Sequence, residues 1–256
     1  MTNSDYAEKI FLGHYRQFLD QGEQPGVFLE KGPGGSLISG VLAISHGFEK
    51  AILIDVGDSA SKDIELYKSI YHKYLPDKLG AFLDEYELTY DVIAALRSRG
   101  ICYETDGLNS LKQVEPDFLA FSFSNAVLEH VKVDEFAETM TQLYRAHKPG
   151  SIGSHRIDFK DHLGGALNNL RFSKSIWESK YFPNSGFYTN RLRYKDIRDI
   201  CVDIGFLVTA EKIDKWDQLP LNAKKMSHEF SVYDEGDLLI SGADLILRKP
   251  ARNNPK

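Results

Sequence analysis

The chain has 256 residues, enough for one large domain, and its 42% hydrophobic and 27% charged content is typical of a globular protein. The net charge of −6 argues against a nucleic-acid surface, and no apolar run approaches the ~20 residues that a membrane-spanning helix needs. Two cysteines, Cys102 and Cys201, are too few for a disulfide framework. We therefore expect a cytoplasmic protein with buried thiols that binds neither nucleic acid nor membrane.

Helical and strand patterns alternate along the chain. In chain order, the patterns predict helix 5–20, strand 26–30, helix 36–47, strand 50–58, helices 60–75 and 80–98, strands 100–107 and 117–125, helix 133–147, strand 151–159, helix 193–205, and strands 206–214 and 243–250. Strands that alternate with helices indicate βαβ units and a parallel sheet. The sequence therefore predicts an α/β fold in one domain that spans residues 1–256.

Three segments stand apart from this alternation. Residues 1–24 are expected to form an N-terminal helical lid. The stretch 59–99 has room for two helices, and we interpret it as an insertion that forms a lid or a contact between two copies of the chain. Residues 160–192 are aromatic and irregular; their aromatic side chains either line a pocket or pack as a small core of their own.

Acidic and polar residues stand where the predicted strands end. Glu30, Asp55 and Asp106 follow the first three strands, and Ser124 and Asn125 end the fourth. In an open parallel sheet a ligand binds at the carboxyl ends of the strands. These side chains are therefore the first candidates for a binding site, although Asp55 and Asp106 are also residue types that stabilise plain turns.

The stretch "FLEKGPGGS" joins the first strand to the first helix of the sheet. Gly32 and Gly34 fit two positions of the dinucleotide fingerprint, but Leu37 occupies the third, and Glu30 would repel a pyrophosphate. No Gly-Lys-Ser/Thr sequence follows, which excludes a P-loop. An NAD(P)-dependent oxidoreductase is thus disfavoured, and a ligand that brings a positive charge and hydroxyl donors suits the carboxylates better.

In order and spacing, "FLEKGPGGS", "ILIDVGD", "YETDG", "FSFSNAVLEHV" and "RAHKPGS" resemble the motifs of class I S-adenosylmethionine-dependent methyltransferases. The resemblance covers roughly residues 25–160. It implies a Rossmann-like, doubly wound, seven-stranded sheet, mostly parallel with an antiparallel last strand and helices on both faces. Lys31 departs from the pattern, which usually has an apolar residue there; it either weakens the site or points away from it.

The resemblance also implies roles for single residues. Glu30, Gly32 and Gly34 match the motif that faces the methionine part of S-adenosyl-L-methionine, and Asp55 matches the acid that binds the ribose hydroxyls. The remaining matches are Asp106 and Gly107 beside the adenine, and Ser124 and Asn125 near the methyl donor.

The segment "SHRIDFKDH" follows the fifth strand, where an acceptor would stand. A histidine has the near-neutral pKa that a general base needs, and we expect His155 to be that base, with His162 and His130 as the other candidates. His130 could instead hold the start of the next helix, and the whole segment could be a solvated loop. A shared metal site is disfavoured, because His155 and Asp158 point to opposite faces of a strand.

These observations favour an enzyme that transfers a methyl group from S-adenosyl-L-methionine to a small or medium-sized acceptor, with oxygen as the expected acceptor atom and no metal. Two alternatives stay open: an NAD(P)-dependent oxidoreductase, and a non-catalytic methyltransferase-like binding subunit. Association of the chain as a homodimer also stays open.

Overall fold

The computed structural model describes residues 4–183 and 185–252. Residues 1–3 of the predicted lid, residue 184 of the predicted 160–192 insertion and residues 253–256 lie outside the described residues. Within the described part, the strands form one seven-stranded sheet in the order β3-β2-β1-β4-β5-β7-β6.

The strands are β1 (Val27–Lys31), β2 (Lys50–Ile54), β3 (Ile101–Glu104), β4 (Leu119–Asn125), β5 (His147–Asp158), β6 (Leu207–Lys215) and β7 (Ile240–Arg248). The α-helices are α1 (Ser4–Asp20), α2 (Ile38–Ser45), α3 (Ile64–Tyr74), α4 (Pro76–Thr89), α5 (Val92–Ser98), α6 (Gly107–Lys112), α7 (Val133–Ala146), α8 (Lys174–Trp177), α9 (Tyr194–Ile204) and α10 (Glu235–Leu238). Short 3-10 turns cover 128–130, 168–171, 223–225 and 228–232.

The strand pairing confirms the predicted fold class. β1 pairs in parallel with β2 and β4, β2 pairs in parallel with β3, and β6 and β7 are antiparallel. The fold is therefore a Rossmann-like, mostly parallel sheet that ends in antiparallel strands. The central strands are buried apolar runs, as expected for parallel strands covered on both faces.

The chain clusters into two compact units. Unit 1 consists of residues 1–124, 142–154 and 249–256, and unit 2 consists of residues 125–141 and 155–248. The chain therefore passes between the units four times, and each unit is described by itself below.

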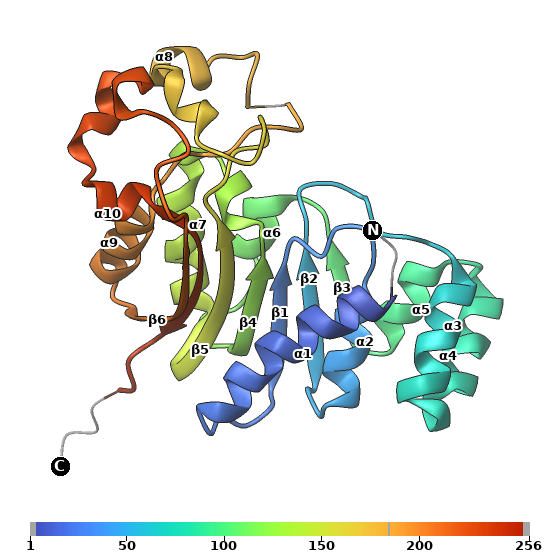
Figure 1. Cartoon of the computed structure of the whole chain (residues 1–256). Helices are drawn as coiled ribbons and strands as arrows, with labels where there is room; N and C mark the ends of the chain where they lie inside the picture. The colour runs from blue at the N-terminus through green and yellow to red at the C-terminus, as the bar shows by residue number, and fades with distance from the viewer. Residues whose placement is uncertain (1–3, 184, 253–256) are drawn as a thin grey trace. The chain divides into compact units, whose positions relative to one another are not determined.

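In unit 1, α1 and α2 lie on one face of the sheet (Figure 1). The α1 residues Phe11 and Phe18 are fully buried, and Phe11 packs edge-on against Phe28 of β1 at 5.9 Å between ring centroids. His14, also in α1, contacts Ser154 at 2.8 Å through its Nδ1 atom. The apolar face of the predicted N-terminal lid is therefore part of the core of unit 1.

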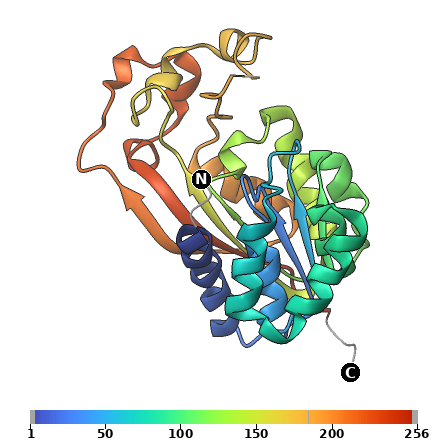
Figure 2. The same cartoon turned by 90° about the vertical axis from the view of Figure 1, so that its right-hand side faces the viewer.

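Helix α6 covers the opposite face of β2 and β3. Successive residues of a strand point to opposite faces, and Ile101 faces Gly40 of α2, so Cys102 faces the side of α6. α6 has only six residues and leaves part of this face uncovered. Helices α3, α4 and α5 lie beyond β3, at the right of Figure 1 and toward the viewer in Figure 2.

In unit 2, α9 packs beside β6 and β7 (Figure 1). Arg193, at the start of α9, is buried, and its guanidinium donates to the carbonyls of Phe159 at 3.1 Å and Ile240 at 2.6 Å. A separate apolar cluster of Leu167, Leu170, Leu221, Phe230 and Leu238 lies in the same unit.

Two element boundaries are located more closely by the structure. The predicted helices 60–75 and 80–98 are separated at Leu75, and Pro76 begins α4, where its missing N–H costs nothing. The fifth strand begins at His147, directly after α7, and not at residue 151. Among the described residues, no helix is both long enough and apolar enough to cross a membrane.

Candidate functional site

The glycine turn after β1 has the backbone conformation that its sequence predicts. Gly32 and Gly34 have φ values of +76° and +62°, a region that favours glycine. A Cβ added at Gly34 would meet no atom within 4 Å, so the space beside this backbone is open. The turn therefore forms an open cradle at the carboxyl end of β1.

Asp55 ties this turn to the end of β2. The Gly34 N–H donates to Asp55 Oδ2 at 3.1 Å, and the Val56 N–H donates to Oδ1 at 2.7 Å. The Ser59 hydroxyl also donates to Oδ2, at 3.3 Å. Because a carboxylate oxygen can accept two hydrogen bonds, Oδ1 can still accept one from a ligand hydroxyl.

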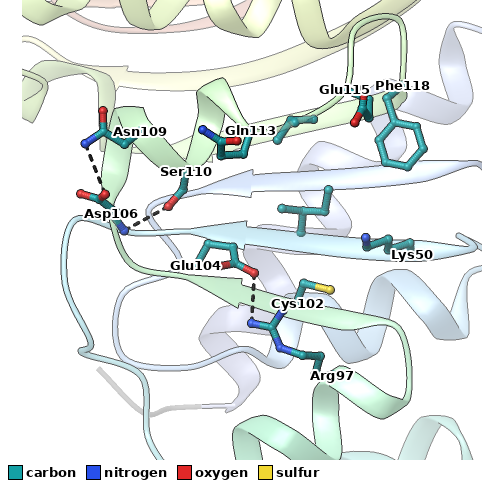
Figure 3. A pocket seen from close by; sticks show the side chains of 12 residues that line it. Lys50, Arg97, Cys102, Glu104, Asp106, Asn109, Ser110, Gln113, Glu115 and Phe118 are labelled. Atoms are coloured by element: carbon teal, nitrogen blue, oxygen red, sulfur yellow. Dashed lines mark hydrogen bonds and ion pairs between the residues drawn. The ribbon is translucent and has the colours of Figure 1, made fainter.

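Asp106 and Gly107 lie beside the same strand end. The Gly107 N–H donates to the Asp55 carbonyl at 2.8 Å, and the exposed Asp106 carboxylate accepts from Asn109 at 3.2 Å (Figure 3). Val56 lies against Gly107 and is 84% exposed. Unit 1 thus brings the glycine turn, two carboxylates and an exposed apolar side chain to one edge of the sheet.

A groove of about 440 Å³ extends from Asp106 along the uncovered face of β2 and β3. Figure 3 shows its walls: the α6 side chains Asn109 and Ser110 on one side, and Cys102 and Glu104 of β3 on the other. Only the Asp106 end of the groove belongs to the edge where the strands end.

Glu30 lies inside β1, and the structure places it deeper than a strand-end carboxylate. Its side chain is buried and accepts a hydrogen bond from the Ser39 hydroxyl of α2. Burial raises the pKa of the Glu30 carboxyl to about 8, and the nearby Asp55 charge adds to the shift. Lys31, the last residue of β1, is buried as well.

Ser124 and Asn125 end β4, as the sequence predicts. Ser124 is fully buried and belongs to unit 1, whereas Asn125 is half-buried and belongs to unit 2.

Unit 2 brings two of the three predicted catalytic histidines together. The ring centroids of His130 and His162 are 4.9 Å apart, and both side chains are exposed. His130 Nδ1 contacts the Tyr188 carbonyl at 2.8 Å. Partial desolvation by the surrounding protein lowers the pKa of His130, and the charge of the neighbouring His162 lowers it further.

His155 does not join this pair at the surface. Because β5 continues to Asp158, His155 lies inside the strand and is 1% exposed. His155 also lies within the predicted strand 151–159, so the expectation that it follows the strand end was wrong.

The Asp161 carboxylate stabilises its own loop through hydrogen bonds. Its carboxylate accepts from the backbone N–H groups of Leu163 at 2.9 Å and Ala166 at 3.2 Å, and from those of Asn168 and Asn169. Asp158 accepts from the Lys160 N–H at 2.9 Å. Across the described residues, no group of three or more histidine, cysteine, aspartate or glutamate side chains is arranged to hold a metal ion.

The aromatic residues of 160–192 pack against one another. Trp177 is fully buried and stacks on Phe182 at 4.9 Å and on Tyr188 at 6.2 Å between ring centroids, while Tyr181 remains exposed.

Two residues at the strand-end edge of unit 1, Val56 and Tyr103, were absent from the site predicted from the sequence. Val56 directly follows Asp55 in the sequence, but its exposure depends on the loop leaving the sheet there. Tyr103 of β3 donates to the Gly57 carbonyl at 2.9 Å and accepts from the Ser59 N–H at 3.1 Å, so it fixes the loop that carries Val56. An apolar residue directly after a strand-end acid is a sequence signal that could have indicated Val56. The role of Tyr103 depends on tertiary contacts that the sequence does not show.

No protein-family model matches this sequence, and no curated protein matches it. Its fold is shared with a SAM-dependent methyltransferase from Archaeoglobus fulgidus, with a TM-score of 0.51, 13% identity, and coverage of 95% of this chain and 94% of that chain. Phosphoethanolamine N-methyltransferase 2 from Haemonchus contortus, solved with S-adenosyl-L-methionine, matches with a TM-score of 0.49 and 14% identity. That match covers 94% of this chain and 52% of the nematode chain, so this chain spans about half its length.

An S-adenosylmethionine-dependent methyltransferase from Mesorhizobium loti matches with a TM-score of 0.45, 13% identity, and coverage of 92% and 97% of the two chains. At these identities, the likeness to the Archaeoglobus structure establishes the fold and nothing beyond it.

Proposed function

We propose that the chain catalyses methyl transfer from S-adenosyl-L-methionine to a small acceptor. The observation that carries the proposal is the meeting of the glycine turn, Asp55 and Asp106 at one edge of unit 1. The open space beside Gly34 fits a ligand that approaches the backbone closely, and the shared fold with the Archaeoglobus methyltransferase supports the same reading.

Each part of this edge suits one part of the cofactor. The free acceptor site on Asp55 Oδ1 suits a ribose hydroxyl, and the Asp106 carboxylate suits the adenine amine. The exposed Val56 side chain offers an apolar surface for the adenine ring. Glu30 and Gly32 are assigned to the methionine part, whose ammonium would favour the ionised form of Glu30.

The cofactor supplies an electrophilic methyl group, and the chain must position the acceptor and take its proton. Within unit 2 we assign the proton to His130 or His162 in place of His155, because the first two rings are exposed and His155 is buried. The lowered pKa of His130 keeps its imidazole neutral at pH 7, which a general base requires. An oxygen acceptor, which must lose a proton, fits this assignment.

Calorimetry with S-adenosylhomocysteine tests the cofactor site. We expect binding in the wild type and about tenfold weaker binding in Asp106→Asn, since a charge-assisted hydrogen bond contributes ~1.5 kcal/mol or more. Asp58→Asn is the matched control, because Asp58 is an exposed carboxylate of the loop between β2 and α3 that pairs with Lys62. Absence of binding at millimolar ligand, or a preference for NADH, would overturn the proposal.

A further inference from the structure

Unit 2 contains a cavity of about 200 Å³ that the proposed methyl transfer does not use. Its lining residues come from the start of α7, the 160–192 insertion and the 3-10 turn at 228–232: Val133, Lys174, Glu178, Asn190, Arg191, Leu192, Glu229, Phe230 and Tyr233. The volume is below the roughly 300–1,000 Å³ of pockets for drug-sized ligands, so a smaller molecule fits.

The deepest charge of this cavity is Arg191, whose side chain is 4% exposed. Its guanidinium carbon lies 5.3 Å from the ring centre of Trp177 and 5.0 Å from that of Phe230. Nη1 donates to the Phe172 carbonyl at 2.6 Å. Arg191 has a φ of +63°, a backbone conformation that is costly for residues other than glycine. The contacts of its side chain hold the residue in this conformation.

Two carboxylates face this guanidinium without a direct hydrogen bond. Arg191 Nη2 lies 3.8 Å from Glu178 Oε1 and 3.6 Å from Glu229 Oε1, beyond the usual N–H···O distance. Glu178 also accepts from the Tyr188 hydroxyl at 2.9 Å, whereas Glu229 Oε1 has no hydrogen-bond donor among the described residues. A buried carboxylate oxygen without a donor costs free energy, which an N–H from a ligand would recover.

The charges decide between an anion and a cation. Arg191, Glu178 and Glu229 sum to −1, and Lys174 lies exposed at the rim, where solvent screens its charge. An anion would have to approach two carboxylates to reach one guanidinium. A cation would meet an excess carboxylate next to the aromatic rings of Phe230 and Tyr233 and the apolar side chains of Val133 and Leu192.

We propose that this cavity binds a small organic monocation, such as a primary ammonium group on a short apolar chain. The proposal is independent of the methyl-transfer function, because its residues belong to unit 2 alone and it would hold even if S-adenosylhomocysteine did not bind.

The same frame supports the histidine pair. Tyr188 contacts His130 through its carbonyl and Glu178 through its hydroxyl, and the Asn190 side chain donates to the carbonyls of Leu128 and Val131 at 2.9 and 3.0 Å. Occupancy of the cavity is therefore expected to affect His130, and the chemical shift of its ring provides a second readout by NMR.

A series of three ligands of equal size and different charge tests the proposal on the full chain. Calorimetry is carried out with butylammonium chloride, 1-butanol and sodium butyrate, each up to about 10 mM, since small ligands of this kind bind weakly. We expect butylammonium to bind at least tenfold more tightly than the other two, and Glu229→Gln to weaken it about tenfold. Glu235→Gln, at an exposed glutamate of α10 outside the cavity, is expected to leave binding unchanged.

Several results would contradict the proposal. Preferential binding of butyrate, equal binding of all three ligands, or no binding of butylammonium would each overturn the cation site. Unchanged butylammonium affinity in Glu229→Gln, with a melting temperature equal to that of the wild type, would show that the cation binds elsewhere.

Discussion

Glu129 is a carboxylic acid that the fold holds away from water. It is buried in the 3-10 turn at 128–130, and its Oε1 accepts from the Asp158 N–H at 3.3 Å. Burial raises the pKa of Glu129 to about 8 from an ordinary 4.5, and the nearby Asp158 charge adds to this. The folded state therefore binds the proton more tightly than the unfolded state does.

This shift predicts a pH-dependent stability. The carboxyl stabilises the fold fully below pH 4.5, and that contribution is lost as the pH rises to about 8, with a total loss of ~2–5 kcal/mol. Glu129→Gln retains the acceptor for the Asp158 N–H, so it should gain stability over wild type between pH 5 and pH 8. Urea unfolding at both pH values measures the difference. A Glu211→Gln control, at an exposed glutamate of β6, should show no such gain. A stability difference between Glu129→Gln and wild type that is the same at pH 5 and pH 8 would contradict the assignment.

The close packing of α2 on the sheet depends on one glycine. A Cβ at Gly40 would lie 2.6 Å from Ile101 Cγ2 and 2.9 Å from Leu53 Cδ1, closer than real side chains approach. We expect Gly40→Ala to cost ~1–3 kcal/mol of unfolding free energy, because the helix must move away from β2 and β3. Denaturant titration measures this change.

Gly80 is the matched control for that substitution. It lies in the exposed interior of α4, where an added Cβ meets nothing within 4 Å. Gly80→Ala should therefore raise stability by ~0.5–1 kcal/mol through helix propensity. Equal effects of the two substitutions would show that the Gly40 contact does not determine the position of α2.

At the level of elements, the sequence predicted what local pattern encodes. The apolar runs of β1, β2 and β4 and the amphipathic stretches of α1, α7 and α9 were predicted to within a few residues, because burial on defined faces dictates them. Parallel strands also bring their ends to one edge, so Asp55 and Asp106 could be predicted as neighbours.

The remaining features depend on contacts between distant residues. The short helices α6, α8 and α10 have too few residues to show a period, and Arg191 meets Glu229 only through tertiary packing. The burial of His155 follows from its place inside β5, where the elements packed on the sheet cover it, and a strand pattern alone does not show which of its polar residues are covered.

Because the chain crosses four times between its units, the last described residues complete unit 1. After β7, Lys249 returns to unit 1, where its ammonium contacts Asp117 Oδ1 at 2.7 Å and donates to the His147 carbonyl at 2.8 Å. The hydrogen bond from Lys249 holds the pKa of Asp117 below its ordinary value. Lys249 and Arg252 are therefore tied to unit 1.

Lys249→Ala should thus destabilise the whole molecule by ~1–3 kcal/mol, because it removes the donor to a carboxylate and to a buried carbonyl. Arg252→Ala removes a second, exposed cation from the same Asp117 and should change stability by no more than ~0.5 kcal/mol. Thermal unfolding of the two variants measures the contrast. Equal melting temperatures for both would show that the chain end contributes no more than a surface ion pair.

The two cysteines differ in a way that makes unit 1 easy to label. Cys201 is buried, and burial raises the pKa of its thiol to about 12, so it reacts slowly with alkylating reagents. Cys102 is half-buried and lines the groove that begins at Asp106. A maleimide dye added to the unmodified protein would therefore attach at one position, close to the edge where the strands end, and its fluorescence could report ligand binding without any engineered residue.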